Sequence, residues 1–145
     1  MLASEGAVLQ VVAPRGGPVT PTNGKANGKA PADGRNGGSR KPLLADKTYL
    51  TADSVQFDAV MAADSLEPDP GVAVIVQEAF RHHKPIAAWG DGRDALVACG
   101  IPTEAPGVVV GERANDEFGA ALVEAMGWHR FWERIPTVLA ARVGI

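Results

Sequence analysis

Four short apolar runs, each bounded by glycine, proline or polar residues, predict the strands of the fold. The runs are rich in β-branched or small apolar residues and do not alternate strictly between apolar and polar positions. Continuous apolar runs of this length are typical of strands that are buried on both faces, as in a parallel sheet. They cover residues 7–13, 57–63, 85–89 and 107–110.

Between the second and third runs, apolar residues recur every three or four positions, which is the spacing of an amphipathic helix. This helix is predicted to start at Pro70, because proline suits the first turn of a helix, and to reach His82 or His83. Its buried face is predicted to carry Val72, Ile75, Val76, Ala79 and Phe80.

Two more helices are predicted in the second half of the chain. One covers residues 91–99 and ends at Gly100, because glycine favours the left-handed position after a helix. The other covers residues 115–134 and starts at Asn115 or Asp116 as its N-cap. Strands that alternate with helices predict an α/β domain with helices on both faces of a parallel sheet. The apolar face of the longer helix is predicted to carry Phe118, Leu122, Ala125, Met126, Trp128 and Trp132.

Residues 15–42 break this alternation. The stretch is dense in glycine, proline, asparagine, lysine and arginine and holds almost no large apolar residue. Such a composition cannot offset the entropy of ordering, about 1–2 kcal/mol per residue, so we predict a disordered loop within one 1–145 domain. Its basic residues either contact phosphate or an acidic partner or, as we favour, are simply solvated.

Composition and charge narrow the classes of function. The formal net charge of −3 gives no indication of nucleic-acid or membrane binding. The single cysteine, Cys99, cannot form an internal disulfide, which fits a cytoplasmic protein. No apolar run approaches the roughly 18–20 residues of a membrane span, and the N-terminus lacks the features of a signal peptide.

Residues 85–99 combine a strand, a tight turn and a helix. In many α/β enzymes such a turn carries a nucleophile, but here it reads Gly90-Asp91-Gly92, without serine or cysteine. Asp91 is interpreted as the N-cap of the helix, and Cys99 as a small buried hydrophobe rather than a nucleophile. A phosphate cradle is the less favoured reading, because the GxGxxG spacing is absent and the aspartates would repel phosphate.

The remaining polar candidates have structural interpretations. Adjacent histidines on a helix point about 100° apart and chelate poorly, so no metal site is predicted. An acidic phosphoacceptor pocket lacks its paired acids, so the acids are interpreted as loop and cap residues. The histidines are His82, His83 and His129, and the acids are Asp58, Asp64, Glu67 and Asp69.

Three aromatic residues near the end of the predicted long helix form a further candidate. Trp128, Phe131 and Trp132 fall at positions i, i+3 and i+4, so they are predicted to share one face and to pack in the core. The alternative is an exposed patch that binds a partner.

Three segments resemble a known family. They read "ADKTYLTADSVQFDAV", "VQEAFRHHKPIAAWGDGRDALVACGI" and "HRFWERIP", and together they resemble the C-terminal domain of large-subunit haem catalases. That domain is flavodoxin-like and similar to the DJ-1/PfpI and class I glutamine amidotransferase group. Compared with the family, the chain lacks the first strand and most of the first helix. We therefore expect that the chain is a fragment or that its assigned start is too late.

The resemblance implies that the turn has lost its chemistry. In DJ-1/PfpI enzymes the corresponding turn carries a reactive cysteine, and Gly90 stands at that position here. The acid that activates the thiol follows the family's first strand, which this chain does not have. The haem pocket belongs to the other domain of catalases, and Tyr49 has no neighbouring pattern that suggests haem ligation. We therefore predict no catalytic, cofactor-binding or metal-binding residue.

The expected function is that of a non-catalytic accessory domain. Its expected partners are a catalase core domain or a second copy of itself, and unfolded client proteins if it also acts as a chaperone-like holdase under oxidative stress. Two alternatives remain open. One is a small-molecule hydrolase or glyoxalase of the DJ-1/PfpI type, and the other is a ligand-binding module that uses the crevice at the strand ends.

Overall fold

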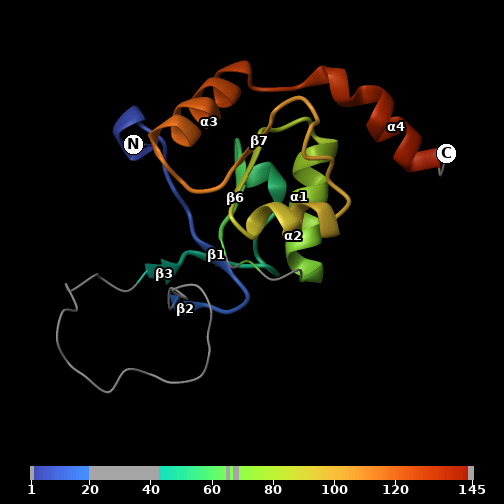
Figure 1. Cartoon of the computed structure of the whole chain (residues 1–145). Helices are drawn as coiled ribbons and strands as arrows, with labels where there is room; N and C mark the ends of the chain where they lie inside the picture. The colour runs from blue at the N-terminus through green and yellow to red at the C-terminus, as the bar shows by residue number, and fades with distance from the viewer. Residues whose placement is uncertain (1, 20–42, 65, 67–68, 144–145) are drawn as a thin grey trace.

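A three-stranded parallel sheet forms the centre of the molecule (Figure 1). The computed structural model describes residues 2–19, 43–64, 66 and 69–143. The strands are β5 (Val60–Ala62), β6 (Ile86–Trp89) and β7 (Val108–Gly111), in that spatial order. The predicted strands over 57–63, 85–89 and 107–110 are therefore confirmed in place, with shorter bounds.

The two faces of β6 are covered by different helices. Ile86 and Ala88 pack on one face with α1 (Pro70–Arg81) and α2 (Gly92–Ala98). Ala87 packs on the opposite face with α3 (Asp116–Trp128) and the 3-10 helix η1 (Leu2–Glu5). Figure 1 shows α3 and η1 on one side of the sheet and α1 and α2 on the other. The predicted α/β architecture, flavodoxin-like with a parallel sheet between helices, is confirmed.

Helix α1 follows its sequence signals closely. Asp69 is the N-cap, and its carboxylate accepts a hydrogen bond from the Gly71 N–H at 2.7 Å, with Pro70 in the first turn. The predicted end at His82 or His83 is confirmed within a residue or two. Its buried residues are the five that the spacing predicted: Val72, Ile75, Val76, Ala79 and Phe80.

The predicted first strand over residues 7–13 is largely wrong. Only β1 (Val12–Ala13) is a strand, paired in parallel with β4 (Lys47–Thr48). Val8 is 87% exposed and Leu9 is 52% exposed. Among the described residues, no strand is hydrogen-bonded to the backbone at Val8 or Leu9. Without a neighbouring strand, these residues do not enter a sheet whose faces are covered, so their side chains stay exposed.

The predicted disordered loop over 15–42 begins too early. Residues Gly17–Val19 form β2, which pairs antiparallel with β3 (Leu43–Ala45). The partner strand lies just beyond the predicted loop, and it satisfies the backbone of a segment whose composition alone does not indicate a strand. Residues 20–42 of the predicted loop lie outside the described residues.

The predicted long helix over 115–134 is broken. Its start is confirmed, because the Asn115 side chain accepts from the Phe118 N–H at 2.9 Å, but α3 ends at Trp128. At His129 the backbone turns with φ 66° and ψ −48°, and the Arg130 N–H donates to the Trp128 carbonyl at 2.7 Å. This i to i+2 hydrogen bond closes a γ-turn. The chain continues through η3 (Trp132–Arg134) and α4 (Ile135–Val143).

The break also overturns the predicted aromatic face. Trp128 and Trp132 are 70% and 61% exposed, so neither belongs to the core. Phe131 is partly buried, and its N–H donates to the His83 carbonyl at 2.8 Å. The physical reason is tertiary: this hydrogen bond draws the chain away from the helix axis and outweighs the helical spacing of the side chains.

Candidate functional site

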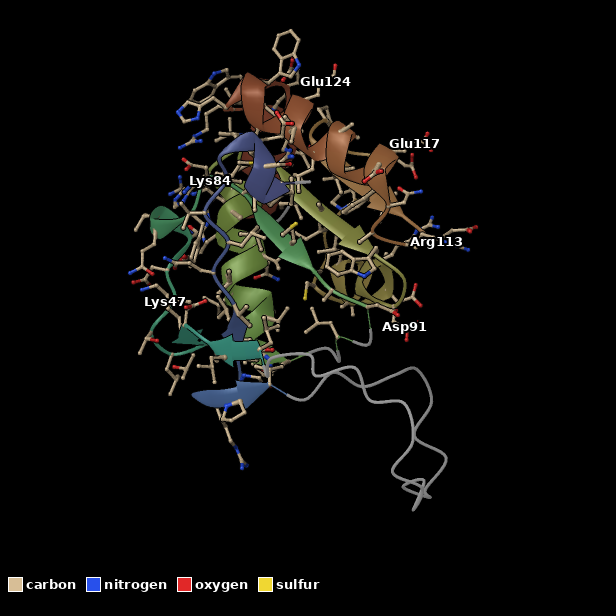
Figure 2. The ribbon with its side chains drawn as sticks, turned by 90° about the vertical axis from the view of Figure 1, so that its left-hand side faces the viewer. Lys47, Lys84, Asp91, Arg113, Glu117 and Glu124 are labelled. Atoms are coloured by element: carbon tan, nitrogen blue, oxygen red, sulfur yellow. The ribbon has the colours of Figure 1, made fainter. Side chains whose placement is uncertain are left out.

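The turn after β6 is an elbow at the carboxyl end of the sheet, where open α/β sheets normally hold ligands. Gly90 adopts φ 55°, and its N–H donates to the Gly111 carbonyl at 3.1 Å, so the turn is tied to β7. Helix α2 begins two residues later. Figure 2 shows Asp91 at this edge, at the opposite end of the sheet from Lys84. The strand, tight turn and helix predicted over residues 85–99 are therefore present.

Asp64 fills the space where a side chain at position 90 would stand. A Cβ atom built on Gly90 would lie 2.1 Å from Asp64 Oδ1 and 2.6 Å from Asp64 Cγ. The same Oδ1 accepts a hydrogen bond from the Asp91 N–H at 2.9 Å. The carboxylate thus takes both the space of a side chain at position 90 and one of the N–H donors of the elbow.

In the rest of the elbow, Gly92 allows close packing against β5, whereas the side chain of Asp91 does not cap the helix. A Cβ atom on Gly92 would lie 2.4 Å from the Ala62 carbonyl oxygen, so α2 starts in direct contact with the end of β5. The predicted capping bond from the Asp91 side chain is absent. Asp91 has helical backbone angles (φ −64°, ψ −16°), whereas a capping side chain reaches back from an extended residue. Its carboxylate is exposed instead.

The acidic candidates serve separate structural roles. Asp64 holds the elbow, and Asp69 caps α1. Asp58 is exposed beside a groove described below, and Glu67 lies outside the described residues. In the described part of the chain, no three histidine, cysteine or acidic residues gather as a metal site would require.

Cys99 lies at the far end of α2 from the elbow. It is 5% exposed and packs with the core residues Leu96 and Ile101. Burial raises the pKa of its thiol, which keeps the sulfur protonated at neutral pH. This environment is that of a small hydrophobe, and a protonated thiol is a poor nucleophile.

The histidines point in different directions. His82 Nδ1 lies 3.1 Å from Ser54 Oγ, and His129 is exposed at the γ-turn. The His83 ring packs against Trp132, with ring centroids 5.2 Å apart. Burial and the nearby Arg134 lower the pKa of His83. The three imidazoles therefore do not converge.

Two buried cations make hydrogen bonds at the amino end of the sheet, and one of them, Arg134, ties the C-terminal segment to it. Arg134 is 1% exposed, donating from Nε to the Pro106 carbonyl at 2.6 Å and from Nη1 to the Lys84 carbonyl at 2.8 Å. Its guanidinium lies between the rings of Phe80 and Phe131, and burial lowers its pKa to about 10. Lys84 donates from Nζ to the Ser54 and Phe57 carbonyls.

Sequence reasoning missed both cations, because charged residues are expected on the surface. A signal was nevertheless present. Lys84 lies in the segment "HKPIAAW" and Arg134 in "HRFWERIP", two of the stretches that carry the family resemblance. The hydrogen bond from Arg134 to the Lys84 carbonyl explains in physical terms why these distant segments go together.

An apolar groove of about 530 Å³ follows the outer edge of β5. One wall is formed by the segment from Ala7 to Val12, including Val8 and Leu9, and the other by residues 57–63. Within the described residues β5 pairs only with β6, so its outer edge has no ladder partner. β7 is the other edge strand of this sheet, but the outer edge of β5 is the one that runs along this apolar groove, where another extended chain could add as a strand.

The architecture and the elbow define the class of protein: a flavodoxin-like α/β domain whose turn after β6 carries glycine at position 90 and is closed by the Asp64 carboxylate. The family follows from comparison with known proteins. Residues 1–136 match the C-terminal domain found in long catalases, and the chain belongs to this family. The predicted resemblance is confirmed.

The curated relatives are catalases of much greater length. Catalase-2 of Bacillus subtilis (strain 168) is 38% identical over 67% of this chain and 15% of its own length. Catalase HPII of Mycobacterium avium is 31% identical over 94% of this chain and 20% of its own length. Catalase HPII of Pseudomonas aeruginosa is 30% identical over 92% and 17%. The chain thus spans a fifth or less of these relatives.

None of the helices in the described ranges has both the length and the apolar character that crossing a membrane demands.

Proposed function

We propose that this chain is a non-catalytic accessory domain that packs on a catalase core, or on another copy of itself, and supports stability and assembly in oxidative-stress defence. The observation that carries the proposal is the contact between Gly90 and Asp64. The elbow keeps the fold around it but holds a carboxylate where a nucleophile would need space. We also propose a reducing, cytoplasmic compartment, in keeping with the single free thiol.

The exposed tryptophans supply a docking surface for this role. Trp128 ends α3 and Trp132 lies in the following turn, both largely exposed. Aromatic residues are enriched at interfaces because they bury a large area with little loss of rotamer freedom. The exposure of Trp128 and Trp132 therefore favours a partner-binding patch over a core position for this aromatic segment.

A thermal inactivation experiment tests the proposal. A large-subunit catalase that lacks its own C-terminal domain is heated with and without this chain, and its residual activity is followed. We expect a longer half-life with the chain, and loss of the gain with Trp128→Ala. Val74→Ala, an exposed apolar change on α1, is the control and should retain the gain. No gain with the unaltered chain would refute the docking role.

Thiol labelling tests the absence of nucleophilic chemistry. Because Cys99 is buried and its pKa is raised, iodoacetamide should label the folded protein slowly at neutral pH and rapidly only after unfolding. Mass spectrometry over time gives both rates. Fast labelling of the folded protein would instead favour the DJ-1/PfpI type of hydrolase or glyoxalase.

A holdase activity is a second candidate function, supported by the groove beside β5. An unpaired strand edge between apolar walls matches the needs of an extended, unfolded chain, which adds as a strand and buries alternate side chains. Val8 and Leu9 expose apolar surface at the same place. The groove therefore offers both backbone and side-chain contacts to a client.

Light scattering of a heat-denatured client measures this activity. We expect the chain to suppress client aggregation at equimolar ratio, and Leu9→Lys to weaken that suppression by placing a charge in the groove. Leu50→Lys is the matched control, because Leu50 is 97% exposed and does not line the groove. Equal effects of the two substitutions, or co-precipitation of chain and client, would remove the holdase role.

A further inference from the structure

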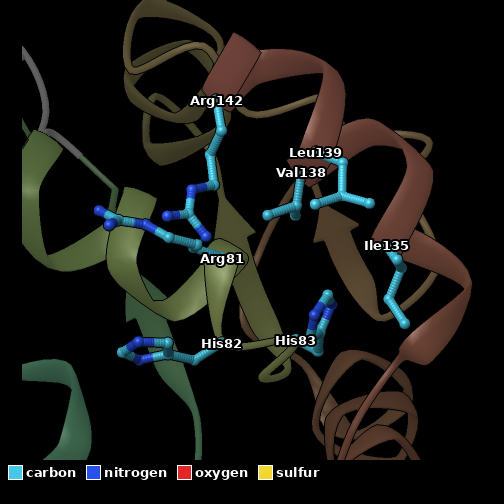
Figure 3. Close-up of a pocket in the computed structure, with 7 residues that line it drawn as sticks. All are labelled: Arg81, His82, His83, Ile135, Val138, Leu139 and Arg142. Carbon is cyan, nitrogen blue, oxygen red and sulfur yellow. The ribbon is translucent and has the colours of Figure 1, made fainter.

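A second cleft, of about 400 Å³, lies between the end of α1 and α4 (Figure 3). Arg81 and His83 line it from the α1 side, and Val138, Leu139 and Arg142 line it from α4. The family match ends at residue 136, so most of the α4 wall lies beyond the region shared with catalase C-terminal domains. The cleft shares no lining residue with the β5 groove, and none of the elbow residues lines it, so it is separate from both.

The cleft carries an excess of positive charge. Arg81 and Arg142 both line it, and among the described residues no carboxylate lines it and neither guanidinium forms an ion pair. Each arginine lies in the last turn of its helix, where a cation offsets a partial charge of about −0.5. The helix dipoles favour an arginine at each of these positions. However, the two full positive charges of the guanidiniums exceed the two partial negative charges of the helix ends, so the cleft stays positive.

His83 adds a buried ring nitrogen that has no hydrogen-bond partner among the described residues. It is a non-glycine residue with φ 61°, a conformation that costs energy and that often marks functional sites. Its Nδ1 is buried without a hydrogen-bond partner among the described residues, and the Phe131 backbone interacts with the ring. Packing on Trp132 also holds the ring at the cleft wall.

Apart from His82, the rest of the lining is apolar. Leu139 is 54% exposed and Ile135 is 42% exposed, and both face the cleft with Val138 (Figure 3). A fully ionic ligand such as phosphate would leave this surface unused, and an uncharged one would leave both guanidiniums without a counter-charge. The combination matches a ligand with an anionic head and a short apolar body.

We propose that this cleft binds small amphipathic carboxylates, with the carboxylate between Arg81 and Arg142 and the apolar body against Val138 and Leu139. Arginine suits this role because its planar donors pair with both oxygens of a carboxylate. The volume lies at the lower end of the range for small-molecule sites, which limits the body to a short chain or a single ring. This site is independent of the proposed accessory role.

Octanoate is the probe, and backbone amide shifts measured by NMR report where it binds. We expect saturable shifts at residues 81–83 and 135–142. Octanol, which has the tail without the charge, and acetate and inorganic phosphate, which have charge without the tail, should each bind at least tenfold more weakly. Equal binding of phosphate or octanol, or shifts confined to residues 7–12 and 57–63, would overturn the proposal.

Matched charge variants separate the cleft from general electrostatics. The double variant Arg81→Gln and Arg142→Gln should weaken octanoate at least tenfold. Arg93→Gln with Arg113→Gln removes the same charge from two exposed positions elsewhere and should leave affinity unchanged. Leu139→Ser, which keeps both charges, should also weaken octanoate. Circular dichroism confirms that each variant is folded, and unchanged octanoate affinity in the first double variant would refute the site.

Discussion

The side chain of Asp64 closes the elbow. It reaches the turn from the end of the neighbouring strand, β5. One oxygen both accepts the Asp91 N–H and occupies the place of a Cβ atom on Gly90. Sequence alone indicated that Gly90 lacks a nucleophile. It could not indicate that Asp64 fills the space, because that contact joins residues 26 positions apart through the packing of β5 beside β6.

A pair of glycine substitutions isolates this contact. Gly90 and Gly100 both have positive φ, 55° and 75°, but only Gly90 is crowded, since nothing lies within 4 Å of a Cβ on Gly100. Gly100→Ala should cost about 1 kcal/mol of unfolding free energy from backbone strain. Gly90→Ala should cost about 1–3 kcal/mol more, because it must displace Asp64 and break its hydrogen bond. Urea unfolding measures both, and equal losses would contradict the crowding.

His83 should make the stability depend on pH. Burial, with the nearby Arg134, lowers its pKa in the folded protein from the ordinary value of 6.5. The unfolded chain then binds more protons than the folded one just below that value, so stability should fall as the pH decreases from about 6.5 through the lowered pKa.

Asparagine variants test this dependence, because asparagine tolerates positive φ and does not titrate. His83→Asn should flatten the decline in unfolding free energy between pH 7 and pH 5. His129→Asn makes the same change at an exposed residue that also has positive φ, and it should keep the slope of the unaltered protein. A slope that is unchanged in His83→Asn would assign the decline to other groups.

At the scale of elements, local patterns predicted α1 and the central strands well, because an amphipathic helix with capping signals and short continuous apolar strands both leave strong local patterns. The failures share one cause. The run over 7–13 was predicted as buried, but burial depends on a neighbouring strand that the run itself does not encode. The helix over 115–134 was predicted as continuous, but the bonds of Phe131 and Arg134 to residues near β6 end it at Trp128.

The γ-turn between α3 and η3 should be improved by glycine. His129 holds φ 66° and ψ −48°, which costs a non-glycine residue about 1–3 kcal/mol. Glycine removes that cost but loses about 0.5–1 kcal/mol of backbone entropy, so His129→Gly should stabilise the protein by about 1 kcal/mol. The urea midpoint should rise with an unchanged slope. A lower midpoint would show that the side chain contributes more than the strain removes.

At the scale of the whole molecule, the β5 groove and the low net charge should both favour association between copies of the protein. The net charge is −3 at pH 7 and the isoelectric point is about 5.6, so repulsion between molecules vanishes near that pH. Apolar walls beside an unpaired strand edge then promote association. Light scattering as a function of pH should therefore show a maximum near pH 5.6.

Two valine-to-lysine variants separate the groove from the charge. Val8 lines the groove and is 87% exposed, whereas Val55 is 72% exposed and lies outside it. Each substitution adds one positive charge, so both should move the scattering maximum upward in pH by the same amount. Only Val8→Lys should also lower its height, because a charge in the groove opposes strand addition. If both variants lower the height equally, association proceeds through net charge alone and the groove is not its site.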